Sequence, residues 1–348
     1  MTCDLKGRRI VLVGGAGFIG HNLALTLAES GAHVEVIDSL QVNNLLWFAS
    51  GSGGEDNRKL YVSILNQRLD LLHKAGIPFH LEDARDYFRL SMVLDKIKPD
   101  VVIHLAAVAH AGRANKDPYS TFDHSLRTLE NSLDFARTSA EHFIFLSSSM
   151  VYGNFQSQEV DETHALEPIG IYGALKLGGE KLVIAYNQVF GLNYTIIRPS
   201  ALYGPRCVSR RVGQVFVENA LNGAKLRVDG DGAERLDFTY VDDFVHGVCL
   251  CIEKREARNQ IFNITYGQAR SIADMVGIVQ RYFPRSQVEY RERDKLMPMR
   301  GTLSVAKAKQ LLGYAPENPL EVGFPKYIEW YRQLQQDGHF WMELMEGA

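Results

Sequence analysis

The N-terminal part of the chain alternates between short runs of β-branched and aliphatic residues and longer stretches in which apolar residues recur at helical spacing. A run at 9–13 ends in glycines, a helical pattern follows over 18–30, and a second strand is predicted over 33–37. A strand, a tight turn, a helix and a second strand in this order are typical of a βαβ unit in a parallel sheet.

The same two patterns continue as far as Pro199. They predict strands at 78–81, 101–104, 142–146 and 193–197, and helices at 57–74, 87–96, 121–140 and 171–190. Residues 41–59 are polar and rich in glycine, which predicts a long loop. Strands that are apolar along their whole length are typical of parallel sheets, because helices cover both faces. The pattern therefore predicts an α/β fold with a Rossmann-like, doubly wound parallel sheet.

Beyond Pro199 the pattern changes, because loops become longer, charges cluster, and short strands mix with helices. This change predicts a smaller, mixed α/β C-terminal lobe that binds the substrate. We assign residues 1–199, together with 237–264, to the Rossmann-like domain. Residues 200–236 and 265–348 are assigned to the substrate lobe.

Length and composition narrow the class of protein. With 348 residues, 46% of them hydrophobic, the chain can bury a large core. The net charge of -3 gives no overall field that would hold nucleic acid or an anionic membrane. No apolar run is long enough to span a bilayer or to serve as a signal core. We expect a cytoplasmic protein without nucleic-acid or membrane partners. Of its four cysteines, Cys249 and Cys251 lie in an apolar helical run and are predicted to be buried hydrophobes, and no metal site is expected.

Three glycines recur at a spacing of three in the first βα turn, at Gly14, Gly17 and Gly20. Their place between a strand and a helix is the context that a dinucleotide-binding turn requires. Gly14 allows the tight turn, Gly17 lets the backbone approach a pyrophosphate, and Gly20 lets the helix pack closely. The start of the helix then offers free N–H groups and a partial positive charge to the pyrophosphate.

Two carboxylates follow the next two strands. Asp38 ends the second strand, where it can accept hydrogen bonds from both hydroxyls of the adenosine ribose. It would repel a 2′-phosphate, so NAD is favoured over NADP, although the nearby Arg58 and Lys59 soften this exclusion. Asp83 follows the third strand, and its carboxylate either binds the adenine amino group or caps the loop.

The candidate chemistry lies on the predicted helix at 171–190. Tyr172 and Lys176 are four residues apart, which places both side chains on one helix face. A free tyrosine has a pKa of about 10, but a neighbouring ammonium and an oxidised nicotinamide ring both favour the phenolate. Tyr172 is therefore a candidate general base for a sugar hydroxyl. Three serines, Ser147 to Ser149, follow the strand at 142–146, where one hydroxyl can share the proton and hold the reacting oxygen.

Together these motifs resemble the NAD-dependent epimerase/dehydratase family, the nucleotide-sugar branch of the extended short-chain dehydrogenases/reductases. Further motifs of that family follow in its order over nearly the whole chain: His104-Leu105-Ala106-Ala107, Ser147-Ser148-Ser149-Met150-Val151-Tyr152-Gly153, Arg198-Pro199-Ser200-Ala201-Leu202-Tyr203-Gly204-Pro205-Arg206, Asp237-Phe238-Thr239-Tyr240-Val241-Asp242-Asp243 and Lys307-Ala308-Lys309-Gln310-Leu311-Leu312-Gly313-Tyr314.

The resemblance implies an enzyme that uses NAD on a nucleotide sugar, and a homodimer joined by the helices at 121–140 and 171–190. It implies that Ser148, Tyr172 and Lys176 form the catalytic triad, with Lys176 also holding the nicotinamide ribose. The cofactor-binding residues that it implies, besides the glycines and aspartates above, are Phe18, Ile19, Ala84, Leu105, Ala106, Ala107, Tyr172, Lys176 and Pro199.

Members of the family differ in the steps that come after the first oxidation. Dehydratases carry an Asp-Glu pair after the catalytic Ser or Thr, and related decarboxylases keep the Glu. Here Ser149 and Met150 stand at those positions, and neither can act as an acid or a base. We therefore predict an epimerase that makes a 4-keto sugar and returns the hydride to its other face, acting on a UDP-hexose or UDP-hexuronic acid.

Departures from the family pattern concern the substrate. Ala201 stands where the family often has Asn, Leu236 where it usually has Arg, and Ser304 where Asp is usual. These replacements put the usual diphosphate grip in doubt and suggest an atypical base or sugar. The predicted substrate-binding residues are Ser148, Ser149, Arg206, Arg210, Arg211, Arg235, Arg293 and Arg300.

Three of these arginines, Arg206, Arg210 and Arg211, follow the last strand of the sheet and either line the pocket mouth or lie in a solvated loop. Arginine pairs well with a diphosphate or with a sugar carboxylate, and the second case would make the substrate a hexuronic acid. Arg293 and Arg300 lie where the family often places a diphosphate-binding arginine, and each is predicted either to bind the diphosphate or to be a surface residue. A decarboxylase, a dehydratase, a reductase that releases NADH, and a non-catalytic NAD-sensing protein remain as alternatives.

Overall fold

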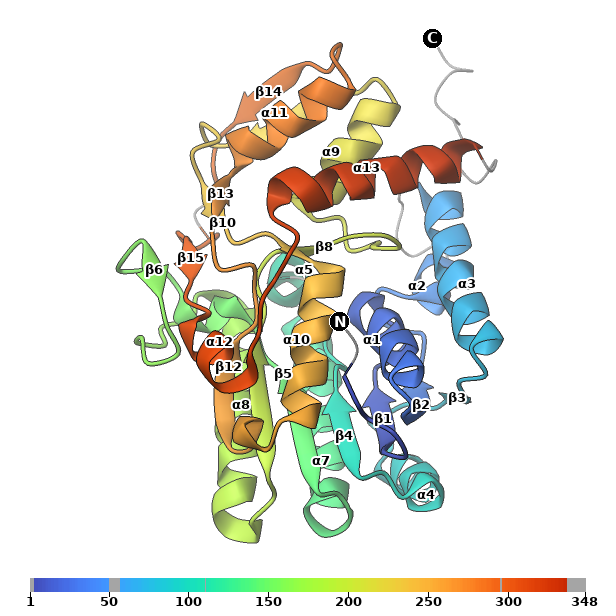
Figure 1. The fold of residues 1–348 in the computed structure, drawn as a ribbon. Helices are drawn as coiled ribbons and strands as arrows, with labels where there is room; N and C mark the ends of the chain where they lie inside the picture. Colours follow the sequence, from blue (N-terminus) through green and yellow to red (C-terminus); the bar gives the residue numbers. More distant parts are fainter. Residues whose placement is uncertain (1–2, 50–56, 110, 295, 337–348) are drawn as a thin grey trace.

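A seven-stranded, wholly parallel sheet forms the centre of the computed structural model, which describes residues 3–49, 57–109, 111–294 and 296–336 (Figure 1). Its strand order is β12-β7-β5-β4-β1-β2-β3. The strands are β1 (Arg9–Val13), β2 (His33–Asp38), β3 (Phe79–Leu81), β4 (Val101–His104), β5 (His142–Leu146), β7 (Tyr194–Arg198) and β12 (Gln260–Asn263). The predicted α/β, Rossmann-like fold is confirmed.

The sheet grows in two directions from β1, which pairs with β2 on one side and with β4 on the other. Doubly wound sheets bind their ligands in the crevice at this switch point, outside the carboxyl ends of the strands. Gly14 directly follows β1, and the backbone N–H groups of Leu105 and Ala106, after β4, donate to the Val13 carbonyl at 2.8 and 3.0 Å. The glycine turn therefore lies at the switch point.

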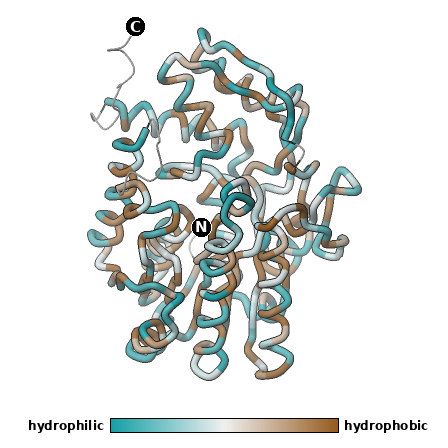
Figure 2. Tube along the Cα trace, turned by 180° about the vertical axis from the view of Figure 1, so that it is seen from behind, coloured by the Kyte–Doolittle hydropathy of each residue, from teal (hydrophilic) through white to brown (hydrophobic). Residues whose placement is uncertain are grey.

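Helices cover both faces of the sheet, and their apolar sides form two separate cores against it. On one face lie α1 (Phe18–Glu29), α10 (Val241–Glu253) and α12 (Ala306–Leu312). On the other face lie α4 (Tyr87–Ile97), α7 (Thr128–Ser139) and α8 (Gly170–Phe190). Hydropathy alternates along these outer helices, as expected of amphipathic helices with one buried face (Figure 2). Within the described ranges, no helix is both long and apolar enough to cross a membrane.

The remaining elements form a smaller mixed lobe above the sheet (Figure 1). Its helices are α9 (Val212–Leu221), α11 (Ile272–Tyr282) and α13 (Leu320–Gln336). Its strands pair in parallel as β9 (Leu226–Asp229) with β14 (Val288–Arg291) and β8 (Leu202–Tyr203) with β11 (Thr239–Tyr240), and antiparallel as β10 (Arg235–Leu236) with β13 (Arg270–Ser271). A parallel pair of β6 (Glu159–Val160) and β15 (Thr302–Leu303) lies beside the sheet domain.

Some segments pack against the part of the molecule to which the sequence did not assign them. α3 (Arg58–Lys74) contributes Tyr61 and Ile64 to the core of the small lobe. α12 and Tyr314 pack against α10 in the core of the sheet domain, although the sequence pattern placed them in the substrate lobe. Where α3 and α12 pack depends on the path of the loops before them. The local pattern of apolar and polar residues does not encode that path.

Two predictions of secondary structure are corrected. The predicted loop at 41–59 contains the short helix α2 (Leu45–Ala49). The predicted single helix at 121–140 is divided into α6 (Pro118–Phe122), a π-helical turn (Asp123–Arg127) and α7, after the short α5 (Ala111–Lys116). A π-turn inserts an extra residue per turn and is common at functional sites. The apolar spacing across such a turn resembles that of a continuous helix, so the sequence pattern did not reveal it.

A buried ion pair joins the catalytic helix to the ends of the strands. Arg198, at the end of β7, and Glu180, on α8, are each 1% exposed. Nε and Nη2 of Arg198 donate to the two carboxylate oxygens at 2.9 and 2.7 Å. Ser147 donates to the same carboxylate at 2.5 Å, and Arg198 Nη1 donates to the Tyr152 hydroxyl, which donates to Asn263. The ends of β5, β7 and β12 are thereby tied to α8.

We expect Arg198→Met to lower the free energy of unfolding by about 3–5 kcal/mol, because the Glu180 carboxylate would remain buried without its cation. Urea denaturation followed by circular dichroism measures this loss. The matched control is Arg8→Met, which breaks the exposed Arg8–Glu141 pair and should cost less than about 1 kcal/mol. Equal losses in the two variants would contradict the role given to the buried pair.

Candidate active site

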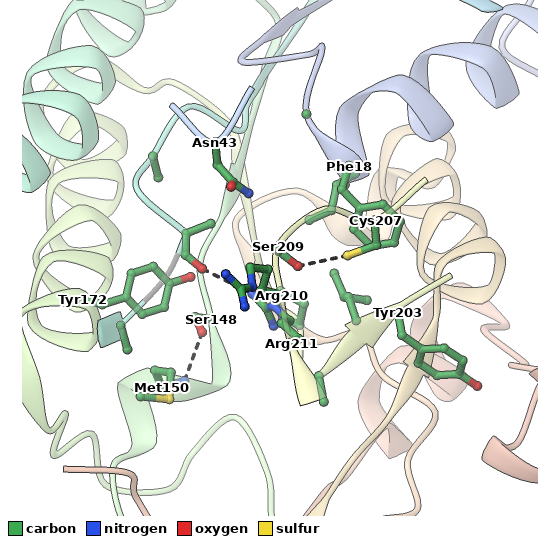
Figure 3. A pocket seen from close by; sticks show the side chains of 18 of the residues that line it. Phe18, Asn43, Ser148, Met150, Tyr172, Tyr203, Cys207, Ser209, Arg210 and Arg211 are labelled. Atoms are coloured by element: carbon green, nitrogen blue, oxygen red, sulfur yellow. Dashed lines mark hydrogen bonds between the residues drawn. The ribbon is translucent and has the colours of Figure 1, made fainter. Parts of the chain in front are cut away.

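A cavity of about 620 Å³ lies between the carboxyl ends of the sheet strands and the small lobe. Residues that follow β1, β2, β4, β5 and β7 line one side, and residues of α9, β9 and α11 line the other. All of the residues predicted to bind the cofactor line it, as does the whole Ser148, Tyr172 and Lys176 triad. Figure 3 shows Tyr172 and Ser148 on one side of this cavity and Cys207 and Tyr203 on the other.

The glycine turn leaves room for a pyrophosphate. Gly14 has φ +82°, and a Cβ there would lie 2.6 Å from the backbone N of Ala106. A Cβ on Gly20 would lie 2.6 Å from Cα of Gly15, so both positions require glycine. α1 starts directly after Gly17 with no side-chain cap and no acidic residue in its first turn. Its free N–H groups can therefore bind an anion, and this turn fits the pyrophosphate of NAD.

Asp38 is fixed next to this turn. Its Oδ2 accepts from the backbone N of Ala16 at 3.0 Å, and its Oδ1 accepts from that of Leu40 at 2.7 Å. Burial raises the pKa of Asp38, while these two hydrogen bonds and the charge of Arg68 oppose the rise. The carboxylate lines the cavity at the end of β2, where it fits the adenosine ribose of NAD.

Arg68 links the glycine turn to the loop that follows β7. It is 1% exposed, and its Nε and Nη2 donate to the Arg206 carbonyl at 3.0 and 2.5 Å. Its Nη1 reaches the Ala16 carbonyl at 3.5 Å. The Arg206 guanidinium donates to Nε2 of His21 at 3.0 Å, and Nδ1 of His21 contacts the Gly17 carbonyl at 2.9 Å. Two hydrogen-bonded paths therefore connect residue 206 to the turn.

Asp83 lies at the far end of the cofactor side and is held by Arg85. The backbone N of Arg85 donates to Asp83 at 3.0 Å and its Nη2 donates at 2.6 Å. Burial raises the pKa of Asp83, but the hydrogen bonds and charge of Arg85 outweigh this and lower it. These bonds are the ones that the loop-capping alternative predicts, although Asp83 also lines the cavity.

The catalytic helix brings the triad together. Tyr172 and Lys176 are buried on the same face of α8, and the Ser148 hydroxyl accepts from the backbone N of Met150 at 3.2 Å. Burial raises the pKa of Tyr172, while the charge of Arg211 and a hydrogen bond with Ser148 oppose the rise. Burial lowers the pKa of Lys176 to about 8, against the effect of Glu180, and its Nζ donates to the Leu146 carbonyl at 2.6 Å.

Ser149 and Met150 also line the cavity, beside Ser148. The backbone N of Ser149 donates to the Pro199 carbonyl at 2.9 Å, which ties the end of β5 to the end of β7. Met150 presents a thioether where the family's dehydratases carry a carboxylate. No proton can be delivered to or taken from a sugar carbon by these two side chains.

The predicted substrate arginines separate into three groups. Arg210 and Arg211 line the cavity and stand between the catalytic side chains and Cys207 (Figure 3). Arg293 and Arg300 line it from the small lobe, on either side of Glu234, at 3.9 and 3.8 Å from its carboxylate. The other two do not line the cavity: Arg206 bonds to α1, and Arg235 donates to the Ala269 carbonyl at 2.7 Å.

Several residues line the cavity although no sequence pattern predicted them to be part of the site. Arg68 comes from α3, and His124 comes from the π-helical turn, where its carbonyl accepts from the Thr128 hydroxyl at 2.9 Å. Glu234 also lines the cavity, as does Ser200, which lies inside the motif at 198–206. Glu234 directly precedes the predicted Arg235, so proximity along the chain was a usable signal. Arg68 and His124 carried none, because their positions depend on helices that only the tertiary structure places.

We expect Ser148→Ala to move the acidic limb of the kcat/KM profile to higher pH and to lower kcat/KM by about 10²-fold. The hydrogen bond with Ser148 lowers the pKa of Tyr172, so its removal raises that pKa and leaves less phenolate at any given pH. The matched control is Ser147→Ala, because Ser147 bonds to Glu180 instead. An acidic limb that moves equally in both variants would contradict the role of Ser148.

Comparison with known proteins agrees with this geometry. Residues 10–265 match the model of the NAD dependent epimerase/dehydratase family. A Bacillus subtilis protein named as an uncharacterized UDP-glucose epimerase is 28% identical, over 94% of this chain and 99% of its own length. An Arabidopsis thaliana UDP-glucuronate 4-epimerase is 26% identical, over 95% of this chain and 76% of its own length.

Solved structures of related enzymes have the same fold. The UDP-glucuronic acid 4-epimerase of Bacillus cereus, in complex with UDP-glucuronic acid and NAD, superposes with a TM-score of 0.82 at 27% identity, covering 93% of this chain and 99% of its own. The UDP-glucose 4-epimerase of Thermotoga maritima, with UDP-glucose, gives 0.80 at 27% identity, covering 94% and 99%. Because the family model matches residues 10–265, most of its length, the chain belongs to the NAD-dependent epimerase/dehydratase family.

Proposed function

We propose that this chain is a nucleotide-sugar 4-epimerase that acts on a UDP-hexose or UDP-hexuronic acid with NAD. The observation that carries the proposal is the composition of the cavity around Tyr172. A base and a hydroxyl, Tyr172 and Ser148, stand there, while Ser149 and Met150 offer no second acid or base. Such a site can oxidise a sugar carbon and reduce it again, but it cannot expel water. Relatives named as UDP-glucose and UDP-glucuronate epimerases support the same reaction.

The protein's own residues perform the proton steps. Burial opposes ionisation of Tyr172, but the positive charge of the oxidised nicotinamide ring would favour its phenolate when NAD is bound. That phenolate takes the proton from the sugar 4-hydroxyl, and Ser148 holds the oxygen through its hydroxyl. When bound, NAD would reversibly accept a hydride from the sugar. Gly14, Gly17 and Asp38 would hold the NAD. The resulting 4-keto sugar turns over in the cavity, and Tyr172 returns the proton when the other face of C4 has been reduced.

Other activities of the family fit less well. A dehydratase needs an acid or base at the position of Met150. A reductase that releases its cofactor often prefers NADPH, which the Asp38 carboxylate disfavours. A decarboxylase is the second candidate, because a 4-keto uronic acid loses CO2 readily. A non-catalytic NAD-sensing protein would not require Ser148, Tyr172 and Lys176 in one cavity.

We expect the purified enzyme to convert one member of a panel of UDP-, GDP-, dTDP- and CDP-sugars, uronic acids included, into a product of unchanged mass, without accumulation of NADH. Nuclear magnetic resonance identifies the product, and absorbance follows NADH. The Tyr172→Phe variant is the control and should be inactive. A product that has lost water or CO2, or NADH formed in step with turnover, would contradict the epimerase proposal and indicate another activity of the family.

Arg211 is the residue we propose for recognising a sugar carboxylate. Arg211 lines the same cavity as Tyr172, toward which its side chain lies (Figure 3), and its Nη2 donates to the Ala109 carbonyl at 3.4 Å. Arg210 instead acts on Tyr61 of α3, and its backbone N donates to Gln214 at 2.8 Å. A carboxylate at C6 would lie next to the reacting C4–C5 region. The substrate would then be a nucleotide hexuronic acid.

We expect Arg211→Ala to lower kcat/KM for a UDP-hexuronic acid by about 10²-fold, since charge-assisted hydrogen bonds contribute about 1.5–3 kcal/mol. The loss for the neutral UDP-hexose should be small. Kinetics with both substrates at the pH plateau measure the difference, and Arg210→Ala is the matched control. Equal losses on both sugars would overturn the recognition of a carboxylate.

We further propose that the enzyme is a cytoplasmic homodimer. The family resemblance points to an interface formed by the helices at 121–140 and 171–190. Exposed apolar side chains on α6 and α8 support this assignment: Phe122, Leu182, Val189 and Phe190. Exposed apolar side chains of this kind would be buried in such an interface.

A further inference from the structure

Two short helices near the glycine turn meet through a cation–π contact. The guanidinium of Arg113, on α5, lies over the ring of Trp47, on α2, with 3.6 Å between its central carbon and the ring centroid. This distance is well inside the limit of about 6 Å for such contacts, and tryptophan is the side chain that attracts a cation most strongly in this way. Both side chains are half-buried, so water and salt screen the attraction only in part.

The sheet topology places this contact across the cofactor side of the cavity. β1 lies between β4 and β2, so the segments that follow β4 and β2 flank the glycine turn that follows β1. The segment after β2 lines the cavity with Asn43 and continues into α2. The segment after β4 leads into α5, which lines the cavity with Ala111 and Gly112. Trp47 and Arg113 do not line the cavity, so their contact joins its two sides from outside.

Hydrogen bonds anchor α2 to the glycine turn and α5 to the catalytic helix. Nδ2 of Asn44, the residue before α2, donates to the Ala16 carbonyl at 3.3 Å. Oδ1 of Asn115, on α5, accepts from the backbone N of Ile171 at 3.1 Å, and Ile171 directly precedes Tyr172. A series of contacts therefore runs from the glycine turn through the two short helices to the start of α8.

We propose that the contact between Arg113 and Trp47 is a latch that retains NAD in the cavity by holding α2 and α5 together. A dinucleotide that extends from the glycine turn to Tyr172 lies between the two segments that this latch joins. Its release requires these segments to separate, and their separation breaks the contact. Arg113 and Trp47 are positioning residues, because they act through the segments that line the cavity. The benefit to turnover, a cofactor that stays to return its hydride, rests on the proposed function, whereas retention of NAD does not.

The test measures the release of NADH, which requires neither sugar nor turnover. Enzyme loaded with NADH is mixed with excess NAD, and the loss of fluorescence from bound NADH gives the release rate. We expect Arg113→Ala and Trp47→Leu each to raise this rate about tenfold, the effect of one cation–π contact that is partly removed from water. The double variant should release NADH no faster than either single variant, because each substitution breaks the same contact. Trp47→Phe keeps an aromatic ring and should release NADH at a rate between those of the wild type and Trp47→Leu.

The matched control is Arg332→Ala, which removes a guanidinium from the rings of Tyr282 and Phe283 at 5.3 and 5.2 Å, in the small lobe and outside the cavity. Its NADH release should match that of the wild type. A release rate that stays unchanged in Arg113→Ala or in Trp47→Leu would overturn the latch. So would a double variant whose effect is the product of the two single effects, because Arg113 and Trp47 would then act on the cofactor separately.

Turnover of the same variants separates the latch from the proposed function. If the enzyme is an epimerase, Arg113→Ala should release NADH into solution during turnover of the UDP-sugar, and its activity should fall with time unless NAD is added. Faster NADH release in the two single variants, without epimerisation by the wild type, would overturn the proposed function and support the latch. Epimerisation by the wild type with equal NADH release in all variants would do the reverse.

Discussion

The buried ion pair between Arg198 and Glu180 determines where the catalytic helix meets the sheet. Two charges that are 1% exposed are tolerated only when each is fully paired, so their geometry leaves α8 no freedom to slide along the strands. Lys176 lies one helical turn before Glu180, and Tyr172 one turn before that. Ser147 binds the same carboxylate and carries Ser148 beside it. One electrostatic constraint thus sets the relative positions of all three members of the triad.

A second hydrogen-bond network connects the cofactor side of the cavity to the substrate side. Arg68 and His21 join residue 206 to the carbonyls of the glycine turn. Arg210 and Arg211 follow four and five residues later and line the cavity. The loop that carries these arginines is therefore anchored to the same backbone that fits the pyrophosphate. Arg206 contributes to the site through this anchoring and not through a side chain in the cavity.

The chemistry of the site is simple. The residues that distinguish this site from those of related enzymes surround the sugar. Apolar or small residues, Met150, Ala201 and Leu236, line the cavity at positions where the family often carries polar ones. Polar groups come instead from Ser200, Glu234 and the arginines of two separate loops. The reaction that remains is oxidation and reduction at one carbon. Which sugar is recognised depends on this altered set of partners.

The sequence alone determined the features that depend on neighbours along the chain. The glycine turn needs a strand before it and a helix after it, and Tyr172 and Lys176 need only one helical turn between them. Such local patterns, together with apolar strands, predicted the sheet, the cofactor and the place of Tyr172 and Lys176 on α8. The tertiary structure decided the features that depend on distant segments. Arg68 reaches the cavity because α3 packs on the small lobe. Arg206 does not line the cavity because its guanidinium donates to His21 of α1. The π-helical turn belongs to this second group, since packing between separate segments leaves no periodic trace in a sequence.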